Sequence, residues 1–128
     1  MSRGLADTSV FIARETDRDI EAQSLPDELA VSVITLGELR AGVLAASETT
    51  IRDRRLSTLA AALRLQPVPI DEEVAASWAK LRLILRDGGL RMPVNDSWIA
   101  ATAIALGVPV VTQDDDFPTL QELEVIRV

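Results

Sequence analysis

Apolar runs alternate with amphipathic stretches along the whole chain, and this alternation predicts its secondary structure. Short runs rich in Leu, Ile, Val and Ala have the length of buried strands, and they lie at residues 5–7, 29–34, 108–112 and 124–128. Longer stretches with apolar residues every three or four positions predict helices, at residues 8–14, 35–46, 50–65, 71–87 and 95–106. Strands separated by helices favour an α/β fold in which helices cover both faces of a mainly parallel sheet.

Polar residues and glycines mark where these helices are expected to begin and end. The expected N-terminal caps are Thr8 or Ser9 for the first helix, Asp71 for the fourth and Asn95 for the fifth. Thr35 and Glu38 have the spacing of a capping box at the start of the second helix. The expected stops are Gly88 with Gly89 after the fourth helix and Gly107 after the fifth.

The composition narrows the chemistry that the chain can perform. Its 128 residues fit one domain, and 48% of them are hydrophobic, so a sizeable aliphatic core is expected. The chain has no His, Cys or Tyr, which excludes thiol nucleophiles, imidazole acid–base pairs, His or Cys zinc sites and disulfides. Asp7 interrupts the first apolar run, and no run approaches the ~20 apolar residues of a membrane span. We therefore expect a cytoplasmic protein without a membrane segment.

The net charge of −7 argues against non-specific binding of nucleic acid through a basic surface. This argument loses its force if several of the acids share one metal site, because bound divalent ions would offset much of the negative charge. Lys80 is the only lysine among the 13 basic residues, and arginine is the better residue for bidentate contacts to phosphate.

Carboxylates stand at the junctions between the predicted strands and helices. Asp7 ends the first strand, Glu38 opens the helix after the second strand, and Asp96 opens the last helix. A run of three aspartates, at 114–116, follows the strand at 108–112. In parallel sheets, ligands bind beyond the carboxyl ends of the strands, and carboxylates acting together hold hard cations such as Mg²⁺. The pattern therefore predicts an acidic metal site at one edge of the sheet.

Each of these acids also has an ordinary structural interpretation. Asp7 can cap the helix that follows it, and Glu38 can be the second half of the capping box. Asp96 can be a first-turn acid that the helix dipole favours, and the run of aspartates can be a solvated turn. The combination of acids at these junctions, more than any single residue, favours the metal site.

Four segments together resemble the PIN domain, and more narrowly the VapC-type toxins of bacterial toxin–antitoxin modules. The segments are Asp7-Thr8-Ser9, Thr35 to Gly42, Asn95 to Ala103 and Val110 to Phe117, of which the second is the most specific. The resemblance covers essentially the whole chain, so it implies a single domain over residues 1–128 with a three-layer α/β/α sandwich. It also implies a Mg²⁺- or Mn²⁺-dependent endoribonuclease that is the toxin of a type II toxin–antitoxin system. The expected partners are RNA, a cognate VapB-like antitoxin that covers the active site, and a second copy in a homodimer.

The resemblance further implies which residues perform the chemistry. The catalytic and metal-binding residues would be Asp7, Glu38, Asp96, Asp114 and Asp116, with the last two as alternatives for the fourth acid. Thr8, Ser9 and Thr112 are candidates to orient a ligand or a phosphate. A metal-activated water would attack the phosphodiester and leave 5′-phosphate and 3′-hydroxyl ends.

Two arginines are candidates for RNA binding on their charge alone. Arg40 and Arg86 can contact the RNA backbone, and both can equally be ordinary charges on a helix surface.

Other functions also fit an acidic site at strand ends. A receiver-like phosphoacceptor domain needs an acidic pair early in the chain and a lysine at a late strand end. This chain offers Asp7 alone, and Lys80 lies within a predicted helix. A phosphatase with an Asp nucleophile typically has a second acid two residues later, where Ser9 stands. A catalytically silent interaction module stays open, because retained acids do not prove turnover.

Overall fold

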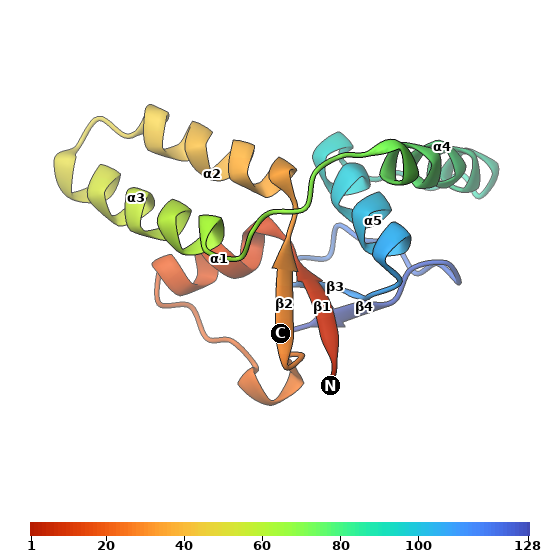
Figure 1. Ribbon diagram of the computed structural model, residues 1–128, viewed down its shortest axis with the longest axis horizontal. Coiled ribbons are helices and arrows are strands. Elements are labelled where there is room, and N and C mark those ends of the chain that lie inside the picture. The colour runs from red at the N-terminus through yellow and green to blue at the C-terminus, as the bar shows by residue number, and fades with distance from the viewer.

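Four short strands form a sheet at the centre of the computed structural model, which describes residues 1–128 (Figure 1). The strands are β1 (Arg3–Ala6), β2 (Glu28–Val31), β3 (Val110–Thr112) and β4 (Val125–Arg127). Their order across the sheet is β2-β1-β3-β4, and each strand is parallel to its neighbours. The predicted parallel sheet is therefore confirmed, and the carboxyl ends of all four strands share one edge.

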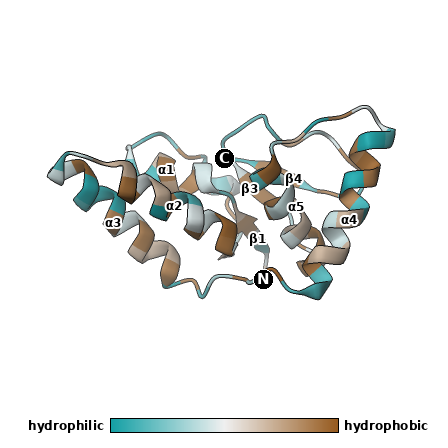
Figure 2. Ribbon diagram, turned by 90° about the horizontal axis from the view of Figure 1, so that it is seen from above, coloured by the Kyte–Doolittle hydropathy of each residue, from teal (hydrophilic) through white to brown (hydrophobic).

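Helices cover both faces of this sheet. They are α1 (Thr8–Glu15), α2 (Val33–Ala45), α3 (Thr49–Leu63), α4 (Glu72–Asp87) and α5 (Val94–Leu106), with a short 3₁₀ helix, η1 (Ala22–Ser24). Figure 1 shows α2 and α3 as a hairpin on one side of the sheet and the α4–α5 pair on the other. The view from above in Figure 2 again places the strands between these two groups. No helix combines the length and hydrophobicity of a membrane span.

Two hydrophobic cores lie on opposite faces of the sheet because successive strand residues point in opposite directions. Leu5 and Val110 pack into the core under α4 and α5, whereas Ala6 and Val111 pack into the core under α1, α2 and α3. The first core also contains Leu81, Leu85, Ile99 and Ala103, and the second contains Val10, Phe11, Leu39 and Leu59. The chain is therefore a three-layer α/β/α sandwich.

The second predicted strand is too long, and α2 begins earlier than expected. β2 ends at Val31, and the Oγ of Ser32 caps α2 by accepting a hydrogen bond from the Ile34 N–H at 3.0 Å. The predicted capping box of Thr35 and Glu38 is therefore wrong. Thr35 is fully buried in the first turn of α2, and Glu38 lies in the second turn. An apolar run of β-branched residues fits a strand and a buried helical turn equally well, so its pattern does not place this boundary.

Two other predicted caps also differ from the structure. The cap of α1 is Asp7, whose carboxylate accepts a hydrogen bond from the Ser9 N–H, and neither Thr8 nor Ser9 fills that role. Helix α5 begins directly after Pro93 without a side-chain cap, so the prediction of Asn95 is wrong.

The boundaries of α4 and the end of α5 agree with the sequence, whereas α3 ends at Leu63, two residues before its predicted end. The Oδ1 of Asp71 accepts a hydrogen bond from the Val74 N–H at 2.9 Å at the start of α4. Gly107 ends α5 with a φ of 69°, in the left-handed region that glycine adopts without strain.

Candidate active site

Asp7 lies at the carboxyl end of β1, where the residue is 2% exposed and both carboxylate oxygens accept hydrogen bonds. Its Oδ1 accepts from the Ser9 N–H at 3.0 Å and from the Ser9 Oγ at 2.5 Å, and its Oδ2 accepts from the Thr112 Oγ1 at 2.8 Å. Burial raises the pKa of Asp7 above its ordinary value, the hydrogen bonds from Ser9 and Thr112 oppose that rise, and the charge of Asp114 adds to it. The donors therefore hold a buried carboxylate in one orientation.

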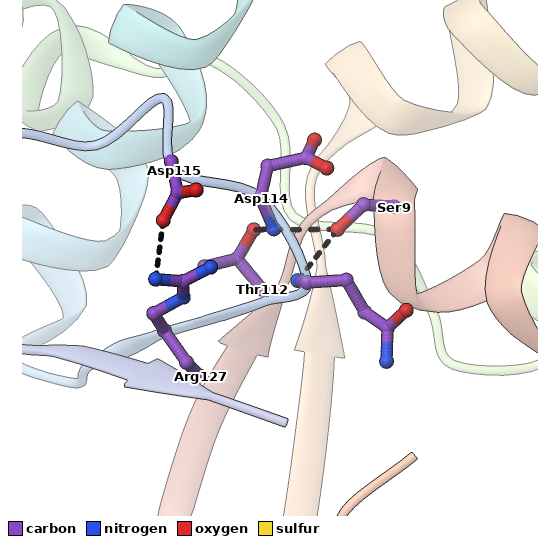
Figure 3. A network of polar contacts seen from close by, with 6 residues as sticks. Ser9, Thr112, Asp114, Asp115 and Arg127 are labelled. Atoms are coloured by element: carbon purple, nitrogen blue, oxygen red, sulfur yellow. Dashed lines mark hydrogen bonds and ion pairs between the residues drawn. The ribbon is translucent and has the colours of Figure 1, made fainter. Parts of the chain in front are cut away.

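The hydroxyls of Ser9 and Thr112 also fix the segment that follows β3 (Figure 3). The Gln113 N–H donates to the Ser9 Oγ at 2.9 Å, and the Asp114 N–H donates to the Thr112 Oγ1 at 2.9 Å. The two hydroxyl oxygens are 3.2 Å apart. This network joins the start of α1 to the end of β3, and it places Asp114 beside Asp7.

Glu38 reaches the same region from α2. The Thr8 hydroxyl donates a hydrogen bond to the Glu38 Oε1 at 2.6 Å, and its oxygen lies 3.0 Å from the Oγ1 of buried Thr35. Thr8 therefore directs the Glu38 carboxylate towards the N-terminal end of α1. The sequence pattern did not single out Thr35 for this contact.

A cavity of about 610 Å³ opens at the carboxyl edge of the sheet and collects the predicted acids. The carboxylates that line it are Asp7, Glu38, Asp96, Asp114 and Asp116. The hydroxyl residues Thr8 and Ser9 also line it, whereas Thr112 sits behind Asp7. Arg18 is the one basic residue of the lining, and no feature of the sequence pointed to it.

Asp96 in the first turn of α5 experiences the repulsion of this cluster most strongly. Its pKa is raised to about 7, first by burial and then by the charges of the other four carboxylates of the cavity. No hydrogen bond stabilises its ionised form. Asp96 therefore favours either a proton or a nearby cation.

The three consecutive aspartates after β3 separate into two groups. Asp114 and Asp116 line the acidic cavity, and both contribute to the raised pKa of Asp96. Asp115 points away and forms an exposed ion pair with Arg127 on β4 (Figure 3). Asp114 and Asp116 therefore both stay candidates for the fourth acid.

The donor set of the cavity fits a hard divalent cation. All its ionisable donors except Arg18 are carboxylates, which suit Mg²⁺ or Mn²⁺. No group of three acidic side chains is arranged to hold one ion directly. Mg²⁺ keeps several waters and commonly takes only one or two carboxylates as direct ligands. An acidic cavity with room for the waters of the ion therefore meets its requirements.

The two arginines proposed from the sequence lie in different places. Arg86 lines a groove of about 420 Å³ together with Arg82 and Arg91, and this groove shares Val94 with the acidic cavity. Arg86 also pairs with Asp87 at 3.3 Å on the exposed surface. Arg40 is exposed on α2 and does not line the acidic cavity.

The sandwich and the acidic cavity at its carboxyl edge define an α/β domain of the type that holds divalent cations with carboxylates. The family model of the PIN domain matches residues 5–123. The chain belongs to the PIN domain family, as its four acidic segments suggested.

Relatives within this family match the chain over nearly its whole length. It is 48% identical to Ribonuclease VapC5 of Mycobacterium tuberculosis over 128 residues, covering 98% of this chain and 95% of the relative. It is 51% identical to Ribonuclease VapC4 of the same organism over 126 residues, covering 98% and 97%. A crystal structure of VapBC-5, a toxin–antitoxin system of Mycobacterium tuberculosis, matches with a TM-score of 0.91 and 44% identity, covering 100% of both chains.

Proposed function

We propose that this chain is a metal-dependent endoribonuclease and the toxin of a toxin–antitoxin pair. The observation that carries the proposal is the convergence of five carboxylates, from four separate segments, on one cavity. Without His or Cys, the chain has a donor set that best supports phosphodiester hydrolysis with carboxylate-held divalent ions. The relatives named Ribonuclease VapC5 and Ribonuclease VapC4 support the same activity.

Asp7 and Asp96 would hold Mg²⁺ or Mn²⁺ directly, and Glu38 with Asp114 or Asp116 would complete the site directly or through water. When bound, the cation supplies an acidified water as the nucleophile and stabilises charge on the phosphate.

The hydroxyl residues around the cavity would hold the acids in place for this reaction. Ser9 and Thr112 keep both oxygens of Asp7 in fixed positions, and Thr8 does the same for one oxygen of Glu38. The cavity contains no imidazole or thiol, so the proton of the attacking water passes to a carboxylate or to solvent. The expected RNA ends are a 5′-phosphate and a 3′-hydroxyl.

A VapB-like antitoxin is the proposed protein partner, and a homodimer is the proposed assembly. The structure of 44% identity belongs to a toxin–antitoxin system, which supports the first. The hairpin of α2 and α3 leaves Leu44 76%, Leu56 46% and Leu63 45% exposed. These exposed leucines give the hairpin apolar surface that a partner protein would cover.

Cleavage of a structured RNA in the presence of Mg²⁺ tests the proposed activity. The wild type should cleave, and Asp7→Asn and Asp96→Asn should each lose about a hundredfold in rate, because each removes a charge of the metal site. Asp115→Asn is the matched control, since this neighbouring aspartate faces Arg127 and should leave the rate unchanged. Equal cleavage by all four proteins, or none by any, excludes the proposal.

The receiver-like alternative has less support from the site. Both oxygens of Asp7 accept hydrogen bonds in a position that is 2% exposed, which is a poor arrangement for accepting a phosphoryl group. Lys80 lies within α4 and does not line the cavity. Incubation with acetyl phosphate should therefore leave the protein unmodified by mass spectrometry.

A further inference from the structure

Arg18 is the only basic side chain that lines the acidic cavity, and neither the metal site nor the fold uses it. It is exposed, and it takes part in none of the ion pairs of the structure, which are Arg3–Glu28, Arg86–Asp87 and Arg127–Asp115. Arg18 is therefore an exposed residue on the wall of a cavity with five carboxylates, and it pairs with none of them.

The chain holds Arg18 in place through a specific turn at the end of α1. Asp17 adopts a φ of 55°, a left-handed conformation that few residues other than glycine adopt. The Arg18 N–H donates to the Ala13 carbonyl at 2.8 Å, and the Asp17 N–H donates to the Arg14 carbonyl at 3.4 Å. These two bonds form a Schellman motif. It reverses the chain so that Arg18 returns to the cavity wall.

A second set of contacts fastens the segment just after Arg18 to the acid-bearing loop. The Gln113 side-chain amide donates to the Asp19 carbonyl at 2.9 Å and to the Val128 carbonyl at 3.0 Å. The backbone N–H of the same Gln113 donates to the Ser9 Oγ. One residue therefore links the turn that carries Arg18 to the network that orients Asp7.

Charge balance gives Arg18 a role in substrate binding. One divalent cation would offset only part of the charge of five carboxylates, so the cavity would still repel an RNA phosphate. A guanidinium at the mouth provides the opposite charge and two parallel N–H donors, the geometry that suits a phosphate group.

We propose that Arg18 binds a phosphate of the RNA strand next to the scissile position, at the mouth of the acidic cavity. This inference rests on the proposed ribonuclease function. It gives the site a positively charged contact for phosphate, which no carboxylate can supply. Arg18 acts on substrate affinity, since it contacts a phosphate that does not react.

Steady-state cleavage kinetics of Arg18→Ala against Arg14→Ala provide the test. Arg14 lies in the last turn of α1, just before the turn that holds Arg18; it carries the same charge and does not line the cavity. Loss of one charge-assisted phosphate contact should raise KM about tenfold in Arg18→Ala and leave kcat within about twofold. The dependence of log(kcat/KM) on log salt concentration should become shallower by about one unit. Arg18→Lys should recover part of the loss, and Arg14→Ala should behave as the wild type.

A binding measurement separates failure of this inference from failure of the proposed function. In an Asp96→Asn background, fluorescence anisotropy with a short single-stranded RNA should show about tenfold weaker binding for Arg18→Ala than for Arg14→Ala. If the wild type cleaves RNA but the two variants share one KM and one affinity, the inference is wrong and the function stands. A loss confined to kcat, or no RNA binding by any variant, also overturns the inference. Circular dichroism of Arg18→Ala should match the wild type because the side chain is exposed.

Discussion

Asp7 and Asp96 line the same cavity, but only the carboxylate of Asp7 is stabilised by hydrogen bonds. Asp7 is buried at the end of β1, and three hydrogen bonds from Ser9 and Thr112 reach its two oxygens. Asp96 is half-buried at the start of α5, and burial together with four neighbouring charges raises its pKa to about 7. Hydrogen-bond donors stabilise the ionised carboxylate of Asp7, whereas neighbouring negative charges destabilise that of Asp96.

This difference shows how the chain accommodates five carboxylates in one cavity. Donors placed on α1 and β3 compensate the burial of Asp7 within the protein itself. The remaining repulsion falls on Asp96, whose helix supplies no donor to its carboxylate. We expect changes at the Asp7 side to reduce stability and changes at Asp96 to leave or raise it.

Thr112→Val should have the largest effect on stability. The substitution keeps the shape of a fully buried residue, but it removes the donor to the Asp7 Oδ2 and the acceptor of the Asp114 N–H. We expect the free energy of unfolding to fall by about 2–3 kcal/mol, because a buried carboxylate loses a partner. Urea unfolding measures this value. Thr119→Val, at an exposed position, is the control and should change it by less than about 0.5 kcal/mol; similar values for both variants would show that Asp7 does not depend on its donors.

The pH dependence of stability should report the charge repulsion at Asp96. Its pKa of about 7 in the folded protein exceeds the ordinary value of 3.8, so folding takes up a proton between these values. Stability without metal should therefore rise as the pH falls from 8 to 6. With allowance for solvent screening of a half-exposed group, the gain is about 1 kcal/mol, or about 3–5 °C in Tm.

The variant Asp96→Asn checks the source of that pH dependence. It removes the titrating group and the repulsion, so its Tm in EDTA at pH 8 should be no lower than that of the wild type, with a flatter profile between pH 6 and 8. Mg²⁺ should raise the Tm of the wild type at pH 8, and the variant should lose most of that gain. A large drop in Tm without metal would instead identify Asp96 as a structural residue of α5.

The sequence predicted the layers of the fold and the meeting of the acids for a clear physical reason. Strand and helix periodicities establish a parallel sheet, and a parallel sheet brings the ends of β1 and β3 to one edge. Asp7 follows β1 directly and Asp114 lies two residues past β3, so the two acids are expected at the same edge, and the pairing of β1 with β3 brings them together. The start of α2 was less predictable, because Ser32 and Thr35 both precede apolar residues and both are fully buried. Only the hydrogen bond from the Ile34 N–H to the Ser32 Oγ identifies the cap.

Other parts of the site depend on contacts between distant segments. Arg18 reaches the cavity through the left-handed turn at Asp17 and the bond from Gln113 to Asp19, and neither has a sequence signal of its own. Among the aspartates after β3, Asp115 faces away from the cavity and pairs with Arg127, which belongs to the last strand. Local pattern identified the acids, whereas tertiary contacts decided which of them face the cavity.

Asp115→Asn should have the smallest effect on stability, because Asp115 lies outside the acidic cavity. The side chains of Asp115 and Arg127 are 80% and 57% exposed, so their ion pair is screened by water and should contribute less than about 0.5 kcal/mol to the free energy of unfolding. Removing this charge should also leave the pH profile of stability unchanged, since Asp115 is not among the charges that raise the pKa of Asp96. Parallel thermal melts of the wild type and Asp115→Asn at pH 6 and 8 measure both quantities. A flatter dependence of Tm on pH in this variant would mean that charges outside the cavity also repel Asp96. The contrast between Asp7 and Asp96 would then not arise from the cavity residues alone.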